Sequence, residues 1–186
     1  SQRQVYVGLA DGRLLVHDLV DGSAVRVIRS PAGLATRVHV NRGELVFGCV
    51  DGAVRAVGAE GGELRWKRAV DGGLGDEGLA VNADEVCVVT SAGAELWRRK
   101  DGALIKRVTS GDAVMHVQAA GRQWLLQVRR PSASGDSVRD VLLAVAGGDA
   151  EPMWEFPAGG RIPGPCGVNA LRVALPTEDG RVVMFR

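Results

Sequence analysis

Residues 40–67, VNRGELVFGCVDGAVRAVGAEGGELRWK, decide the fold, because looser copies of this stretch recur along the chain. Two short apolar runs, residues 45–49 and 53–57, flank the dipeptide Asp-Gly at positions 51–52. Asp and Gly tolerate the positive φ angles of tight hairpin turns, so the two runs predict a β-hairpin. A second turn, Glu-Gly-Gly at positions 60–62, leads into a further alternating run. The stretch therefore predicts a small antiparallel meander.

The hairpin turn of this meander recurs with a period of about 40 residues. Asp51 follows Asp11 by 40 positions (51 − 11), and Ala92 of the next turn follows Asp51 by 41 positions (92 − 51). Such a period, with several short strands in each repeat, is typical of propeller blades. No segment carries apolar residues at three- and four-residue intervals over a dozen positions without an interrupting Gly, so the pattern predicts strands rather than helices.

We predict an all-β fold, a β-propeller of about five four-stranded repeats with the first and last incomplete. The repeats span approximately residues 4–34, 35–75, 76–112, 113–160 and 161–186. An innermost strand is missing from the first repeat and an outermost strand from the last, so the expected strand counts are three, four, four, four and three. Residues 1–186 then form a single propeller domain or a segment of a larger propeller.

Two recurring polar features support the repeat. Three of the predicted first strands end in Val-Asn, at Asn41, Asn82 and Asn169. Acidic residues recur at turns, at Asp11, Asp51, Asp101 and Asp179. Asp in these positions stabilises turn geometry, so we assign the acidic residues to the backbone and not to catalysis.

Composition limits the classes of function. The 186 residues are 46% hydrophobic and 24% charged, with a net charge of +1, which is typical of a folded globular protein and argues against disorder and nucleic-acid binding. No window approaches the roughly 18 consecutive apolar residues of a membrane span. Ser1 in place of Met suggests a processed or excised segment.

The three cysteines, Cys49, Cys87 and Cys166, are far apart and form no Cys-x-x-Cys pair. This sparse, odd number argues against a disulfide framework and a structural zinc site. We interpret them as small buried hydrophobic residues in strands. They favour a reducing compartment, and so the cytoplasm over the periplasm or another extracytoplasmic space.

The second copy resembles the pyrroloquinoline-quinone-like (PQQ-like) repeat of the quinoprotein alcohol dehydrogenase-like superfamily, in its non-catalytic branch. The family pattern is Ala-x-Asp-x-x-Thr-Gly-x-x-x-Trp, and the aligned residues here are Ala56, Gly58, Gly61, Gly62 and Trp66. Ala, Gly and Trp are retained, whereas Asp and Thr are lost. The resemblance covers nearly the whole chain and implies PQQ-like or WD40-like propeller blades.

The resemblance also implies a role for the repeated tryptophan, which in the family docks against a neighbouring blade. Trp66 and Trp154 are the residues at this position in the second and fourth copies. Arg26 and Lys106 replace them in the first and third copies. We expect Trp66 and Trp154 to be structural, and the other two junctions to have drifted or to use the aliphatic stems of the basic side chains.

Residues 129–140, RRPSASGDSVRD, open the hairpin of the fourth copy. Pro, Ser, Gly and charged residues in this density predict a mobile surface loop, and a long excursion from a tight repeat suggests protein contact. The candidate interaction residues are Arg129, Arg130, Ser132, Asp136 and Arg139.

His39 and His116 occupy equivalent places in the first strands of their repeats. In a propeller that strand lines the central channel, so the two imidazoles could face a common space and bind a ligand or a metal. No carboxylate or cysteine recurs beside them, and ordinary polar channel lining explains them better. We assign no catalytic, cofactor-binding or metal-binding residue and predict no cofactor.

The leading hypothesis is a non-catalytic propeller scaffold or protein–protein interaction module, a subunit or domain of a larger assembly. Its partners are proteins, including a second copy of the chain joined through the incomplete terminal blades, and not nucleic acid. One alternative is a fragment of a PQQ-dependent quinoprotein dehydrogenase, which would bind quinone and Ca²⁺. Another is a ligand-sensing extracytoplasmic propeller domain of a receptor. Members of the family with this repeat include both scaffold proteins and sensor domains of receptors.

Overall fold

The computed structural model describes residues 3–71, 74, 78–108, 113–131, 138–148, 152–169 and 172–185. Every regular element in these ranges is a β-strand. No helix long and apolar enough to cross a membrane occurs among the described residues. The chain divides into two compact units, Ser1–Asp76 and Glu77–Arg186, and each is described by itself. Whether they form a single domain stays a prediction.

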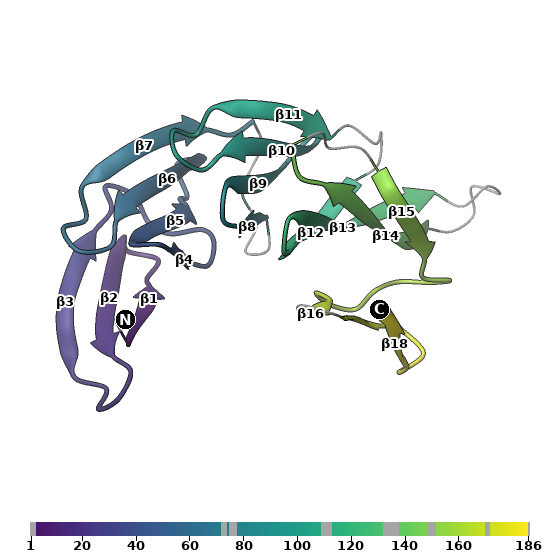
Figure 1. Ribbon diagram of the computed structural model, residues 1–186, viewed down its shortest axis with the longest axis horizontal. Coiled ribbons are helices and arrows are strands. Elements are labelled where there is room, and N and C mark those ends of the chain that lie inside the picture. The colour runs from purple at the N-terminus through teal and green to yellow at the C-terminus, as the bar shows by residue number, and fades with distance from the viewer. Residues whose placement is uncertain are drawn as a thin grey trace. The chain divides into compact units, whose positions relative to one another are not determined.

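The first unit contains two antiparallel sheets (Figure 1). One has the order β1-β2-β3, with β1 (Gln4–Gly8), β2 (Arg13–Asp18) and β3 (Ala24–Arg29). The other has the order β4-β5-β6-β7, with β4 (His39–Asn41), β5 (Glu44–Gly48), β6 (Ala53–Gly58) and β7 (Leu64–Ala69). Each strand pairs with its neighbour in sequence, as in a meander.

The second unit contains three antiparallel sheets of the same kind. The first comprises β8 (Leu79–Val81), β9 (Glu85–Thr90), β10 (Gly93–Arg98) and β11 (Leu104–Val108). The second comprises β12 (Ala113–Ala120), β13 (Gln123–Pro131), β14 (Val138–Ala146) and β15 (Pro152–Pro157). The third comprises β16 (Gly167–Val168), β17 (Val173–Pro176) and β18 (Val182–Phe185). Among the described residues, the predicted strand counts of three, four, four, four and three are therefore confirmed.

The turns have the local geometry that their sequences predict. Gly12 and Gly52 adopt φ angles of 89° and 72°, in the left-handed region that glycine enters without strain. The Asp51 carboxylate accepts a hydrogen bond from the backbone N–H of Ala53 (3.3 Å) and also binds the buried Arg55 guanidinium through two hydrogen bonds. The hydrogen bonds and charge of Arg55 hold the pKa of Asp51 well below its usual range. This aspartate thus stabilises both the turn and the strand that follows it.

The recurrent Val-Asn also has a structural explanation. The Asn82 side-chain oxygen accepts hydrogen bonds from the backbone N–H groups of Asp84 (2.9 Å) and Glu85 (2.8 Å). Asn169 accepts one from the N–H of Arg172 (2.9 Å) in the last sheet. Asparagine therefore closes the short turn between the first and second strands of a repeat.

A bulge recurs at the same place in four sheets. It lies at the start of β3, β7, β11 and β15. In each of these strands the first and third residues pair with two consecutive residues of the preceding strand, so the second residue has no partner in the register. The unpaired residues are Val25, Arg65, Ile105 and Met153. The next residues, Arg26, Trp66, Lys106 and Trp154, consequently occupy one equivalent register position.

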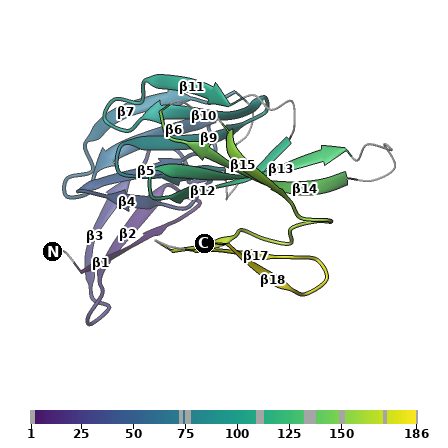
Figure 2. The same cartoon turned by 45° about the vertical axis from the view of Figure 1, so that its right-hand side comes forward.

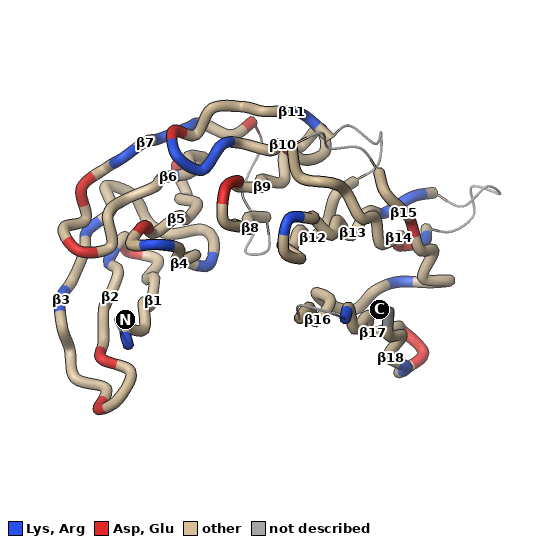
Figure 3. Tube along the Cα trace, in the orientation of Figure 1, with Lys and Arg blue, Asp and Glu red and all other residues tan. Residues whose placement is uncertain are grey.

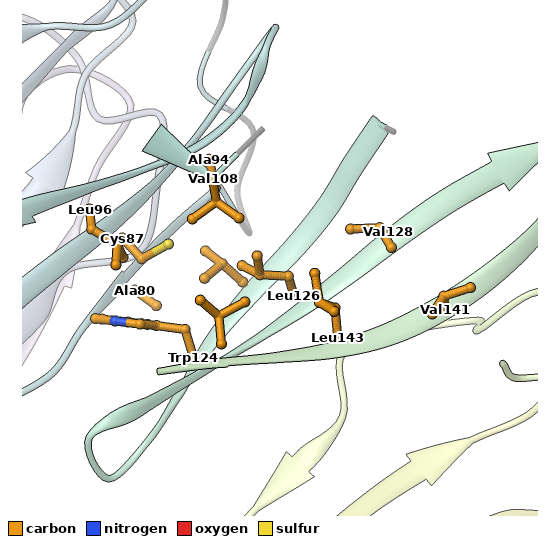
Figure 4. Packing of buried hydrophobic residues seen from close by; sticks show 12 residues of the cluster. Ala80, Cys87, Ala94, Leu96, Val108, Trp124, Leu126, Val128, Val141 and Leu143 are labelled. Atoms are coloured by element: carbon orange, nitrogen blue, oxygen red, sulfur yellow. The ribbon is translucent and has the colours of Figure 1, made fainter. Parts of the chain in front are cut away.

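Apolar side chains pack between neighbouring sheets within each unit. In the first unit, Leu14 and Ile28 of the β1–β3 sheet belong to one buried cluster with Leu45 and Phe47 of β5. In the second unit, Cys87 and Leu96 pack with Trp124, Leu126 and Leu143 (Figure 4). Alternate residues of β13 and β14 face the other way, where Leu125 and Leu142 join Ile162 and Leu175. The β12–β15 sheet is thus buried on both faces.

The edge strands differ in their exposed chemistry. Arg65, Lys67 and Arg68 lie on β7, and Lys106 and Arg107 lie on β11 (Figure 3). Charged side chains on an edge strand oppose pairing with a further strand. By contrast, β18 exposes Val182 and Met184 at the edge of its sheet. The three-stranded sheet at the end of the second unit therefore lacks this protection on β18.

Candidate interaction surface

The hairpin of β13 and β14 extends beyond the other two strands of its sheet (Figure 2). The last partner of β12 on β13 is Arg129, and the last partner of β15 on β14 is Val141. The hairpin continues to the Pro131–Val138 pair. The predicted loop over residues 129–140 was therefore wrong in its extent, because residues 129–131 and 138–140 are strand residues. The signal available in the sequence was the opposite charge of Arg129 and Asp140, which pair across the hairpin.

Arg129 and Asp140 form an ion pair at the base of this extension. Arg129 Nε lies 2.9 Å from Asp140 Oδ1, and Arg129 Nη2 lies 3.3 Å from Oδ2. Asp140 is fully buried, whereas the Arg129 side chain is 29% exposed. An ion pair buried on one side needs further hydrogen bonds to offset desolvation of the charge.

Those further hydrogen bonds join two parts of the second unit. Asp140 Oδ2 accepts a hydrogen bond from the backbone N–H of Ile162 (2.9 Å) and one from Gln127 Nε2 (3.2 Å). Gln127 Nε2 also donates to the Ile162 carbonyl (3.1 Å). Although burial raises the pKa of Asp140, the donors, with Arg129 the largest, outweigh it and hold this pKa below its usual value. Asp140 is thus a structural carboxylate between β14 and the segment leading to β16.

The other two described arginines of the candidate set lie on the opposite face of the hairpin. Arg130 and Arg139 are directly opposed across the strands, in the register that places their side chains on one face. Arg130 Nη1 lies 2.8 Å from Glu155 Oε2 on β15. Arg139 is exposed, and no carboxylate pairs with it among the described residues. The structure thus brings Arg130 and Arg139 together, whereas Arg129 has a structural role as the partner of Asp140.

The remaining two candidate residues, Ser132 and Asp136, lie outside the described residues. Their part in an interaction stays a prediction.

The two tryptophans at the repeat position have different environments. Trp66 is 6% exposed, whereas Trp154 is 36% exposed. At the equivalent position of the first sheet, Arg26 Nη2 donates to the backbone carbonyl of Ala59 (2.6 Å), which follows β6 in the next sheet. Docking of Trp66 and Trp154 against a blade stays a prediction.

The two histidines equivalent in sequence belong to different units. His39 lies on β4 of the first unit and His116 on β12 of the second. A shared channel around them stays a prediction. Of the cysteines, Cys49 and Cys87 are buried, and the half-buried Cys166 donates to Gln118 Oε1 (3.3 Å). Burial raises the pKa of the Cys87 thiol far above its usual value.

Sequence reasoning missed a buried carboxylate at the opposite end of the β12–β15 sheet from the hairpin extension. Glu85, the first residue of β9, is 9% exposed and accepts a hydrogen bond from Trp124 Nε1 (3.0 Å). It lines a pocket of about 420 Å³ with Asp84, Arg122 and Met153. The available signal was the recurrence of glutamate at the start of this strand, since Glu44 begins β5.

Comparison with known proteins shows the fold. No protein-family model matches the chain, and no curated protein matches it. Among solved structures, the chain is similar to the crystal structure of BamB from Moraxella catarrhalis, with a TM-score of 0.54 and 12% sequence identity. The match covers 100% of this chain and 73% of that chain. This likeness, together with the repeated four-stranded sheets, shows that the chain has the β-propeller fold.

Proposed function

We propose that this chain is a non-catalytic β-propeller scaffold that binds another protein through the extended β13–β14 hairpin. The observation that carries the proposal is the opposed pair Arg130 and Arg139, which lies on the part of the hairpin beyond the described pairs of β13 with β12 and of β14 with β15. Like charges directly opposite each other destabilise a strand pair. Glu155 already pairs with Arg130, whereas Arg139 has no carboxylate partner among the described residues. A partner that presents carboxylates to this face would relieve the remaining repulsion and gain charge-assisted hydrogen bonds.

Hydrogen bonds at the base of the hairpin hold its two strands in a fixed arrangement. Arg129 and Asp140 join the two strands immediately below the opposed arginines, and Asp140 is hydrogen bonded to the segment beyond β15. An interaction surface that is already ordered loses less conformational entropy on binding. The described part of the hairpin, up to the Pro131–Val138 pair, therefore supports recognition without a separate folding step.

Charge reversal tests the proposal. The Arg130→Glu/Arg139→Glu variant and the full chain are used as baits for chemical crosslinking and affinity capture from the source cell. We expect a defined set of partners to be lost from the variant and retained by an Arg172→Glu control, which reverses an exposed charge immediately before β17. Circular dichroism and melting curves check that both variants fold. Equal capture by the folded hairpin variant contradicts the proposal.

A second candidate is self-association, which the exposed edge of β18 favours. Val182 and Met184 are exposed on that edge, and Val5 and Val7 are exposed on β1, the edge of the first sheet. Apolar edge strands with unpaired backbone groups readily pair with another chain. Light scattering of the chain and of a Val182→Lys/Met184→Lys variant tests it, since a dimer should become a monomer. The quinoprotein, ligand-sensing and cytoplasmic hypotheses stay predictions.

A further inference from the structure

The pocket beside Glu85 contains an incompletely balanced buried charge. Glu85 is 9% exposed. Among the described residues, its carboxylate has one hydrogen-bond partner and no ion-pair partner: Trp124 Nε1 donates to Oε2 (3.0 Å). An ionised carboxylate accepts up to about four hydrogen bonds, and a buried charge is stabilised when a cation lies beside it. The indole N–H supplies one donor and no net charge. The carboxylate therefore keeps acceptor capacity toward the pocket that it lines.

The equivalent glutamate of the first unit shows which kind of group pairs with a carboxylate at this position. Glu44 begins β5 as Glu85 begins β9, and it is 2% exposed. Arg65 Nη1 lies 3.5 Å from Glu44 Oε1, so a guanidinium balances this carboxylate. Arg65 is the unpaired bulge residue of β7. In the sheet of Glu85, the equivalent bulge residue is Ile105, which has no charge, and Arg98, directly opposite Glu85, pairs with Asp101 instead (3.0 Å).

The pocket has the size and walls for an incoming guanidinium. Its volume is about 420 Å³, and Met153 and Ala146 line it together with Asp84, an exposed second carboxylate. A long aliphatic stem can lie against the apolar side chains while the planar fork of donors reaches both carboxylates. Glycine at position 147 leaves room for the Glu85 carboxylate, because a Cβ there would lie 2.7 Å from Glu85 Oε2 and 2.6 Å from the Arg122 carbonyl oxygen.

We propose that this pocket receives the guanidinium of an arginine side chain presented by another polypeptide, with Glu85 as the buried anchor. The ligand replaces in trans the cation that Arg65 supplies in cis to Glu44. Arg122, at the exposed rim, is placed to donate to a backbone carbonyl of the same ligand. The site lies at the end of β13 and β14 away from Arg130 and Arg139, so it is separate from the hairpin surface.

Titration with Nα-acetyl-L-arginine amide tests the proposal directly. The indole N–H resonance of Trp124 reports on the site, because this group is bonded to Glu85. We expect a saturable shift of that resonance. The neutral isostere Nα-acetyl-L-citrulline amide and the Glu85→Gln variant should each weaken binding by about tenfold or more. Equal binding of the citrulline probe, or no saturable shift up to the solubility of the arginine probe, overturns the proposal.

A gain-of-function variant gives a second, independent readout. Ile105→Arg places a guanidinium at the position that Arg65 occupies in the other unit. We expect a higher melting temperature and loss of arginine-probe binding, because the variant fills its own site. The Ile105→Gln control should keep probe binding. If folded Ile105→Arg binds the probe like the unmodified chain, the assignment of Glu85 by analogy with Glu44 is wrong. Neither readout involves Arg130 or Arg139, so failure here leaves the hairpin proposal standing.

Discussion

The β4–β7 and β12–β15 sheets have the same strand order and the same bulge, yet they bury different groups. Trp66 and Trp154 occupy equivalent positions opposite Ala56 and Ala144, but Trp66 is 6% exposed and Trp154 is 36% exposed. In the β12–β15 sheet, the buried Asp140 accepts a hydrogen bond from the backbone N–H of Ile162, which lies outside that sheet. The comparison teaches that the repeat specifies the backbone, whereas neighbouring segments decide which side chains contribute most to stability.

Removal of Trp66 should give the largest effect. Trp66→Ala deletes a buried indole and leaves a cavity, so we expect a loss of about 4 kcal/mol in the free energy of unfolding. Urea unfolding followed by far-ultraviolet circular dichroism measures it. The Trp66→Phe variant, which retains an aromatic ring, should lose much less. A small loss for Trp66→Ala would mean that the two tryptophans are equivalent after all.

Removal of the Asp140 carboxylate should rank next. Asp140→Ala leaves Arg129 without its partner and the Ile162 amide without its acceptor, so we expect a loss of about 3 kcal/mol. The matched control is Glu155→Ala, which removes a 53% exposed partner of Arg130 and should cost well under about 1 kcal/mol. Similar losses for the two variants would contradict the anchoring role of Asp140.

The pH dependence of this anchor sharpens the same comparison. The folded-state pKa of Asp140 lies below its unfolded value of 3.8, so its stabilisation is present above that pH. It is lost as the pH falls below 3.8 toward the folded-state pKa. The difference in melting temperature between the unmodified chain and Asp140→Asn should therefore be constant from neutral pH to about pH 5 and shrink on further acidification. A difference that grows in acid would show that the pKa of Asp140 is raised.

The arginine at the equivalent position of the first sheet should have a smaller effect. Arg26→Met keeps an aliphatic stem but loses the hydrogen bond to the Ala59 carbonyl, so we expect a loss of about 1–2 kcal/mol. Arg29→Met, on the same strand, is the control for loss of a positive charge. Urea midpoints for both variants separate the inter-sheet hydrogen bond from a general charge effect.

Truncation of Trp154 should give the smallest effect of the series. Trp154→Ala removes a ring that remains about a third exposed, so we expect a loss of about 1 kcal/mol. The measurement is the same urea unfolding as for Trp66→Ala. A loss as large as that of Trp66→Ala would show that exposure does not distinguish the two positions.

Sequence reasoning reached the interaction surface only in part. The segment around Arg130 and Arg139 stood out because a long polar insertion interrupts a tight repeat. The composition of the segment suggested a loop, however, and composition alone cannot show that Arg129 pairs with a buried Asp140. The partner of that pair, Ile162, lies 22 residues further along the chain, beyond the reach of any local pattern.

By itself, the sequence determined the strand order, the number of strands in each sheet and the turns, because these depend on local alternation and on Asp and Gly at fixed spacings. The tertiary structure alone decided that Trp66 is buried and Trp154 half-exposed, that Arg129 stabilises the fold, and that Glu85 lies beside Trp124. These environments arise from contacts between strands and between neighbouring sheets, since burial and charge pairing depend on the neighbours that folding supplies.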